Sequence, residues 1–150
     1  MKIAFGCDHG GIVLRPEVME YLLKNGYEVI DFGIKEEESV DYPDYGQMVA
    51  ECVAAGDADF GIVICGTGIG ISIAANKVPG IRAAVVSDTF TAHATREHNN
   101  ANVLAMGGRT IGPGLAVDIV GLFLKTPFSN GERHQRRIDK ITAVEKKYSK

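Results

Sequence analysis

The chain has 150 residues, of which 45% are hydrophobic and 23% charged, values that are typical of one globular domain. The net charge of −3 is distributed unevenly, because residues 1–131 are acidic and residues 132–150 are basic. No apolar run approaches the ~20 residues that cross a bilayer, the first residues lack a secretory signal pattern, and the three cysteines form no C-x-x-C pair. We therefore expect a cytoplasmic protein, not a membrane protein, a disulfide scaffold or a structural zinc domain.

Short apolar segments alternate with longer segments of helical period along the chain. The first expected strand, 2–6, is followed by a helix over 14–24, a strand over 27–32 and a helix over 43–55 that turns Met48 and Val49 inward. The later strands are expected over 60–65, 82–86 and 102–106, and the later helices over 71–76, 89–98, 114–124 and 133–147.

This alternation predicts a three-layer Rossmann-like α/β fold. Five parallel strands form the sheet, helices cover both faces, and an extra C-terminal helix follows. Segment 60–65 is apolar on both faces, as a central parallel strand should be. We expect one domain over 1–150, in which 132–150 form a basic helical arm.

Ligands in such open sheets bind beyond the carboxyl ends of the strands, so the residues after each strand are the candidates for chemistry. The third strand is followed by Cys65-Gly66-Thr67-Gly68-Ile69-Gly70 and then a helix, an arrangement that favours an anion cradle. The alternative is a tight turn in which glycine serves geometry alone. Position 71 is isoleucine, so neither the dinucleotide fingerprint, the phosphate-binding P-loop nor a cysteine phosphatase loop is present.

Cys65 ends the third strand and faces the start of a helix, a setting that favours a thiolate. Thr67 is close enough in sequence to hydrogen-bond the sulfur. The alternative for Cys65 is a small buried hydrophobic residue, which is the interpretation we favour for Cys7 and Cys52.

Two pairs of polar residues flank other strands. Asp8 and His9 follow the first strand, where Asp8 could fix the His9 tautomer or bind a hydroxyl group. His98 and Asn99 end a helix, a suitable position for acid–base chemistry. His93 lies five residues before His98 and should face another direction, so no metal pair is expected.

Arginines supply the candidate anion contacts. Arg109 follows the fifth strand. In the basic arm, Arg133 and Arg137 are four residues apart and share a helix face, so they could hold one anion, whereas Arg136 should point elsewhere. The acidic remainder of the chain disfavours nucleic acid and favours a small phosphate ester.

Taken in order, these motifs resemble the B-type ribose-5-phosphate isomerase family, which also includes allose-6-phosphate isomerases and galactose-6-phosphate isomerase subunits. The resemblance covers the whole chain and rests on Asp8-His9-Gly10-Gly11, Asp41-Tyr42-Pro43-Asp44, the loop 65–70, His98-Asn99 with Ala101-Asn102-Val103-Leu104, Gly108-Arg109 and Arg133-His134-x-x-Arg137. Asn100 departs from the aspartate that is common there. Cys65 together with Ile71 indicates the subtype with a cysteine base.

The resemblance implies that D-ribose 5-phosphate and D-ribulose 5-phosphate are interconverted through an enediol, a step of the pentose phosphate pathway, without metal or cofactor. It also implies a homodimer or a dimer of dimers with shared active sites. The expected catalytic residues are Cys65, His98, Thr67 and Asp8, and the expected substrate-binding residues are Asp8, His9, Tyr42, Gly66, Thr67, Gly68, Ile69, Gly70, Asn99, Arg109, Arg133 and Arg137. The alternatives are an isomerase of six-carbon sugar phosphates and a non-catalytic module that binds a phosphosugar or nucleotide.

Overall fold

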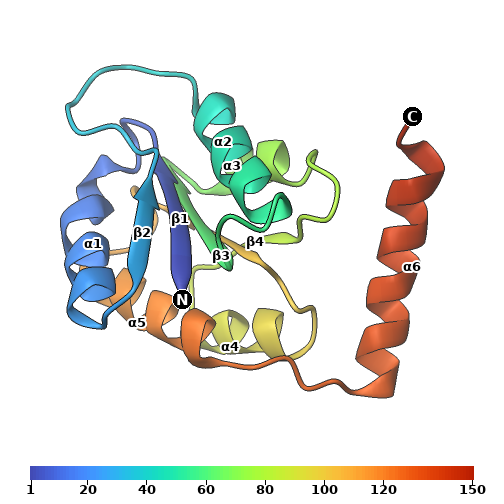
Figure 1. The fold of residues 1–150 in the computed structure, drawn as a ribbon. Helices are drawn as coiled ribbons and strands as arrows, with labels where there is room; N and C mark the ends of the chain where they lie inside the picture. The colour runs from blue at the N-terminus through green and yellow to red at the C-terminus, as the bar shows by residue number, and fades with distance from the viewer.

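The computed structural model describes residues 1–150 and has a five-stranded parallel sheet at its centre (Figure 1). The strand order is β2-β1-β3-β5-β4, with β3 in the middle and buried on both faces. All four strand pairs are parallel. The carboxyl ends of the strands therefore share one edge. The strands are β1 (Lys2–Cys7), β2 (Glu28–Asp31), β3 (Phe60–Cys65), β4 (Ala83–Val85) and β5 (Val103–Gly107).

Helices cover both faces of the sheet, which confirms the predicted three-layer α/β architecture (Figure 1). One core lies between the sheet and α1, α4 and α5, and includes Phe5, Ile64 and Phe123. The other lies between the sheet and α2 and α3, and includes Val49 and Ile71. The helices are α1 (Arg15–Lys24), α2 (Tyr42–Ala54), α3 (Ile69–Ala75), α4 (Thr89–Glu97), α5 (Pro113–Lys125) and α6 (Glu132–Tyr148), and a 3-10 turn, η1 (Ile12–Leu14), precedes α1.

Local sequence signals explain most of the helix boundaries. Proline occupies the first turn of α1, α2 and α5, where its missing N–H has no helical partner to lose. Asp88 caps α4 by accepting a hydrogen bond from the N–H of Thr91 at 2.7 Å. Helix α3 begins two residues earlier than predicted, at Ile69, because Gly68 adopts a left-handed conformation and turns the chain at once.

One predicted core residue is wrong. Met48 of α2 is 37% exposed, whereas Val49 and Ala50 are fully buried. Helix α2 thus meets the sheet through Val49, Ala50 and Val53, and the Met48 side chain lies beside the open edge of β2.

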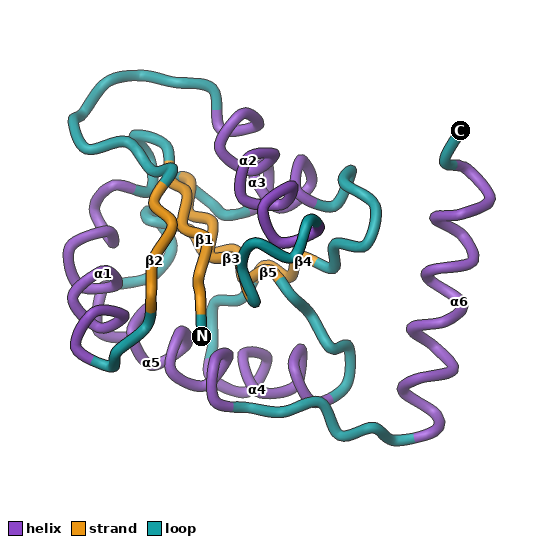
Figure 2. Tube along the Cα trace, in the orientation of Figure 1, coloured by secondary structure: helices purple, strands orange, loops and turns teal.

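Helix α6 stands apart from the sheet and the other five helices (Figures 1 and 2). Only His134 and Ile138 of this helix are buried, and its apolar stripe continues through Ile141, Val144 and Tyr148, which are exposed. Near its end, the Glu145 carboxylate accepts a hydrogen bond from the N–H of Gly80 at 3.1 Å. None of the helices is both long and apolar enough to cross a membrane.

Candidate active site

Three loops meet at the carboxyl edge of the sheet, after β1, β3 and β5. The N–H groups of Gly108 and Arg109 donate to the carbonyls of Cys65 and Gly66 at 2.8 and 2.9 Å. The loop after β1 approaches so closely that a Cβ on Gly10 would lie 2.7 Å from the nitrogen of Gly66. Glycine is therefore required here to let three backbones pack together.

The thiol of Cys65 lies at the centre of this edge and is buried. Its Sγ accepts a hydrogen bond from the N–H of Gly68 at 3.1 Å. Gly68 has a φ of 78°, and a Cβ there would come within 2.8 Å of the Met106 backbone, so only glycine can present its N–H to the sulfur.

The predicted contact between Thr67 and the Cys65 sulfur is wrong. The Thr67 hydroxyl instead accepts a hydrogen bond from the N–H of Ile69 at 3.2 Å, at the first turn of α3. A threonine hydroxyl readily accepts a bond from the N–H two residues further along the chain. The Cys65 sulfur is therefore contacted by the N–H of Gly68 and not by Thr67.

Asp8 and His9 also differ from the expected pairing. Asp8 is buried, and its Oδ1 accepts hydrogen bonds from the N–H groups of Gly10 and Gly11 at 2.8 and 3.0 Å, while Oδ2 accepts none from the protein. The N–H of Val40 donates to Nδ1 of His9 at 3.2 Å, so the neutral imidazole carries its proton on Nε2. The loop residue Val40, and not Asp8, sets the tautomer.

A cavity of about 550 Å³, here called the Cys65 cavity, opens between these residues and residues 39–42. Residues 39–41 belong to the long loop that runs from β2 to α2 (Figure 2). Sequence reasoning missed Ser39 and Asp41, although Asp41 lies beside Tyr42 in the motif that carried the resemblance. The Tyr42 ring packs on α3, where a Cβ on Gly70 would lie 2.5 Å from it. The lining residues are Asp8, His9, Gly10, Ser39, Val40, Asp41, Tyr42, Cys65, Gly66, Thr67, Ile69, Gly70 and Arg109.

The other two cysteines are buried residues outside this cavity, as predicted. Burial raises the pKa of Cys7 to about 11, and the nearby Arg15 guanidinium opposes this only in part because it is paired with Asp31. Burial also raises the pKa of Cys52. Both thiols are therefore kept neutral.

A second polar group, here called the His98 cluster, lies at the opposite edge of the sheet. His98 ends α4, immediately before the start of β5, and its ring stacks on His134 with centroids 4.5 Å apart. Burial lowers the pKa of His134, and the neighbouring His98, Arg133 and Arg137 side chains add to this effect. The cluster surrounds a cavity of about 600 Å³ lined by Glu97, His98, Ser129, Gly131, Glu132, Arg133, His134 and Arg136.

One expectation about this cluster is corrected: Arg136 does not point away from it. Arg136, not Arg137, lines the cavity with Arg133, because residues three apart also share a helix face. His93 and His98 each approach the Glu97 carboxylate at 3.5 Å, and only His98 lines the cavity. No group of three His, Cys, Asp or Glu side chains is arranged to hold a metal ion.

Within one chain, the structure thus separates the predicted site into two parts. The Cys65 cavity is lined by Arg109 and by the predicted residues that follow β1 and β3. The one exception is Gly68, which does not line the cavity but donates its N–H to the Cys65 sulfur. His98 and Arg133 lie in the His98 cluster, and Asn99 lines a groove between β4 and α6. The physical reason is that His98 and Asn99 precede a parallel strand, which must start at the amino edge.

The chain matches known proteins along almost its entire length. The family model described as Ribose/Galactose Isomerase matches residues 3–141. The chain is 51% identical to ribose-5-phosphate isomerase B of Escherichia coli over 146 residues, 97% of each protein. The structure of the Clostridium thermocellum ribose-5-phosphate isomerase B superimposes with a TM-score of 0.97 at 60% identity, covering 99% of this chain and 100% of that one.

A further solved structure carries a sugar phosphate. Ribose-5-phosphate isomerase B from Mycoplasma genitalium, with bound ribulose-5-phosphate, superimposes with a TM-score of 0.91 at 44% identity, covering 97% of this chain and 96% of that one. A family match over most of the chain, relatives of about half identity and the same fold all agree. The chain therefore belongs to the ribose/galactose isomerase family.

Proposed function

We propose that this protein is a cytoplasmic isomerase that interconverts D-ribose 5-phosphate and D-ribulose 5-phosphate, the isomerase step of the pentose phosphate pathway. The observation that carries the proposal is the Cys65 cavity, in which a thiol held by a backbone N–H faces the same space as the free oxygen of Asp8 and the Arg109 guanidinium. Family membership supports the same reaction.

The chemistry assigns a role to each group. Cys65, as a thiolate, removes the proton from C2 of the open-chain aldose and returns it to C1, passing through an enediol. The N–H groups of Thr67 and Gly70, which make no hydrogen bond to another protein group, can stabilise the negative charge that develops on the carbonyl oxygen. Oδ2 of Asp8 is free to bind a sugar hydroxyl. The electrons stay within the substrate, so no redox cofactor is required.

The phosphate and the closed sugar ring need groups that the Cys65 cavity does not contain. Its one arginine, Arg109, is opposed by Asp8 and Asp41, which is too little positive charge for a phosphate dianion. The His98 cluster has the missing groups: an imidazole that can move a proton during ring opening, and the arginines of α6.

We infer that two copies complete each other's sites in a homodimer. The exposed apolar stripe of α6, Ile141, Val144 and Tyr148, supports this arrangement, because it is the kind of helical face that packs on another protein surface. In such a dimer, His98 and Asn99 with Arg133 and Arg137 of one copy would face the Cys65 cavity of the other.

The proposed reaction can be tested in deuterium oxide by proton NMR with ribose 5-phosphate. Isomerisation through an enediol with a single solvent-exchangeable base incorporates deuterium into the product. Formation of ribulose 5-phosphate is the expected result, and binding without turnover would instead support a non-catalytic phosphosugar-binding module. A parallel measurement of kcat/KM on allose 6-phosphate decides between five-carbon and six-carbon substrates.

A further inference from the structure

The segment between α4 and β5, residues 98–102, carries His98 and Asn99, and two arginines from elsewhere hold its backbone. Asn100 in this segment has a φ of 46°, a left-handed conformation that is uncommon for a residue with a side chain. A segment that carries two candidate site residues and includes such a conformation needs external support to keep a single shape.

Arg82, just before β4, supports the segment from one side. Its Nε donates to the carbonyl oxygens of Asn99 and Asn100 at 3.1 and 3.3 Å, and its Nη2 donates to that of Asn100 at 2.9 Å. The N–H of Arg82 also donates to Oδ1 of Asn102 at 2.8 Å. The guanidinium therefore contacts the backbone of the very residue, Asn99, that is a candidate substrate contact.

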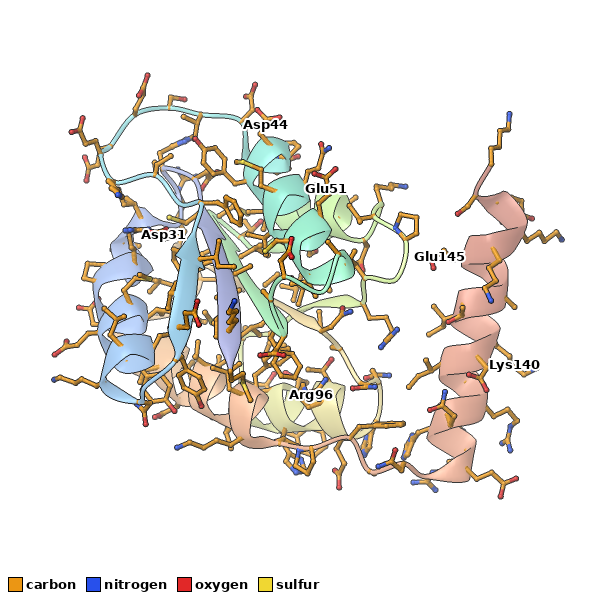
Figure 3. All side chains as sticks on the ribbon, viewed as in Figure 1. Asp31, Asp44, Glu51, Arg96, Lys140 and Glu145 are labelled. Atoms are coloured by element: carbon orange, nitrogen blue, oxygen red, sulfur yellow. The ribbon has the colours of Figure 1, made fainter.

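Arg96 lies in the last turn of α4 (Figure 3). Its side chain is 6% exposed and supports the segment from the other side. Its Nη1 donates to the Ala101 carbonyl at 2.5 Å and to Oδ1 of Asn100 at 2.9 Å. Its Nε donates to the carbonyl of Thr126 at 3.4 Å, in the segment that leads into α6. Arg96 therefore connects the His98 segment to the root of the helix that carries Arg133.

Backbone carbonyls of the segment face both guanidinium groups, and the Glu145 carboxylate also opposes the charge of Arg82. Neither makes a salt bridge, and the Arg96 guanidinium instead lies 4.6 Å from the centroid of the Phe60 ring. Burial lowers the pKa of both arginines, and the positive charge of Arg82 lowers that of Arg96 further. The Arg82 and Arg96 guanidinium groups are partly or fully removed from water, so each needs acceptors for its N–H groups. The carbonyls of residues 99–101 provide these acceptors, and this requirement fixes the path of the segment.

We propose that Arg82 and Arg96 are positioning residues of the isomerase: they fix His98 and Asn99 in the geometry that ring opening and substrate binding require. The inference rests on the proposed function and goes beyond it, because neither guanidinium lines the Cys65 cavity or the His98 cluster. They act through the backbone of residues 99–101.

The test uses two reactions of the full-length protein that need His98 to different extents. Conversion of ribose 5-phosphate starts from a closed ring and needs ring opening. Exchange of the C1 proton of ribulose 5-phosphate with deuterium oxide starts from an open chain and needs only the base in the Cys65 cavity. Arg82→Met should lower kcat for conversion by about 10-fold or more, as expected for a misplaced acid–base group, and leave saturated exchange within about 3-fold.

Arg82→Lys keeps the charge and one donor, so it should recover part of the lost conversion. Lys77→Met removes an exposed charge from the groove that Arg82 and Asn99 also line, and it should leave both reactions unchanged. In a His98→Ala background, Arg82→Met should lower kcat for conversion much less than it does in the wild type, because only its effect through Asn99 remains. Arg96→Met should have the same effects as Arg82→Met, and circular dichroism shows whether it folds. If Arg96→Met does not fold, Arg82→Met alone tests the proposal, because Arg82 is only partly buried.

The outcomes separate the two proposals. Conversion by Arg82→Met within about 2-fold of the wild type, or an equal fall in conversion and exchange, would overturn the positioning role. Absence of both reactions in the wild-type protein would instead overturn the proposed function.

Discussion

The Cys65 cavity and the His98 cluster lie at opposite edges of one sheet and differ in character. The first is built from strand-end loops and holds a buried thiol and two carboxylates against one arginine. The second is built from the ends of α4 and α6 and holds stacked histidines and arginines. In the proposed mechanism, the first region supplies the groups for proton transfer at carbon, and the second supplies those for ring opening and phosphate binding. Under this proposal, one chain carries all the catalytic groups but does not bring them together by itself.

The largest effect should follow from removal of the thiol. Cys65→Ala should lower kcat for ribose 5-phosphate by about 10²–10⁴-fold, the usual contribution of a general base, while circular dichroism shows an intact fold. Cys52→Ala is the matched control, because it removes a buried thiol outside the cavity. Near-normal turnover by Cys65→Ala would reject the thiol as the base.

The division between the two regions can be tested directly by mixing inactive variants. Chains with Cys65→Ala and chains with His98→Ala, co-expressed with different tags, should regain about a quarter of the wild-type activity if sites are shared in a two-fold dimer. This is because half of the dimers are mixed and each mixed dimer has one intact site.

The control for this experiment pairs two variants from the same region. Cys65→Ala with Asp8→Asn should regain nothing, since both changes fall in the Cys65 cavity. If the His98 mixture also regains nothing although mixed dimers form, the two regions do not meet between copies.

A smaller effect is expected from the arginines of α6. Arg137→Ala should raise KM for ribose 5-phosphate by about 10- to 100-fold with a modest change in kcat, which corresponds to the loss of a charged hydrogen bond. Lys140→Ala, an exposed charge on the same helix, is the control. Kinetics with Arg136→Ala would show which arginine pairs with Arg133, since the structure places Arg136 in the cavity. An unchanged KM in Arg137→Ala would remove that residue from the phosphate site.

The smallest effect concerns the stability of the His98 cluster at acid pH. The pKa of His134 is lowered in the folded protein, so the folded state takes up a proton there less readily than the unfolded chain. Its contribution to stability is therefore present above the unfolded pKa of ~6.5 and is lost as the pH falls below it.

This contribution can be measured by thermal unfolding. Between about pH 7.5 and about pH 5.5, the wild-type Tm should fall by a few degrees more than that of His134→Gln, which cannot titrate. Identical pH dependences of the two proteins would contradict the assignment.

Much of the cavity could be predicted from the sequence because its residues follow strands. Asp8, Cys65 and Arg109 lie at or just after the last residue of a strand, and parallel strands bring their carboxyl ends to one edge. The partners of these residues could not be predicted in the same way. The Gly68 N–H at the sulfur and the Val40 N–H at His9 depend on where loops cross, which no local pattern encodes. Arg82 and Arg96 gave no signal at all, because their role depends on backbone carbonyls.

The alternation of apolar segments with amphipathic helices is enough to specify the parallel sheet and the cavity at its carboxyl edge, because side-chain period and strand direction are local properties. The placement of His98 and the arginines of α6 at the far edge was decided only by the packed chain. Residues 98–102 lead into β5 and so lie where that strand begins, and α6 follows the end of α5, which lies beside the end of α4. That separation, together with an arm whose apolar stripe stays exposed, is a property of how the elements pack in three dimensions.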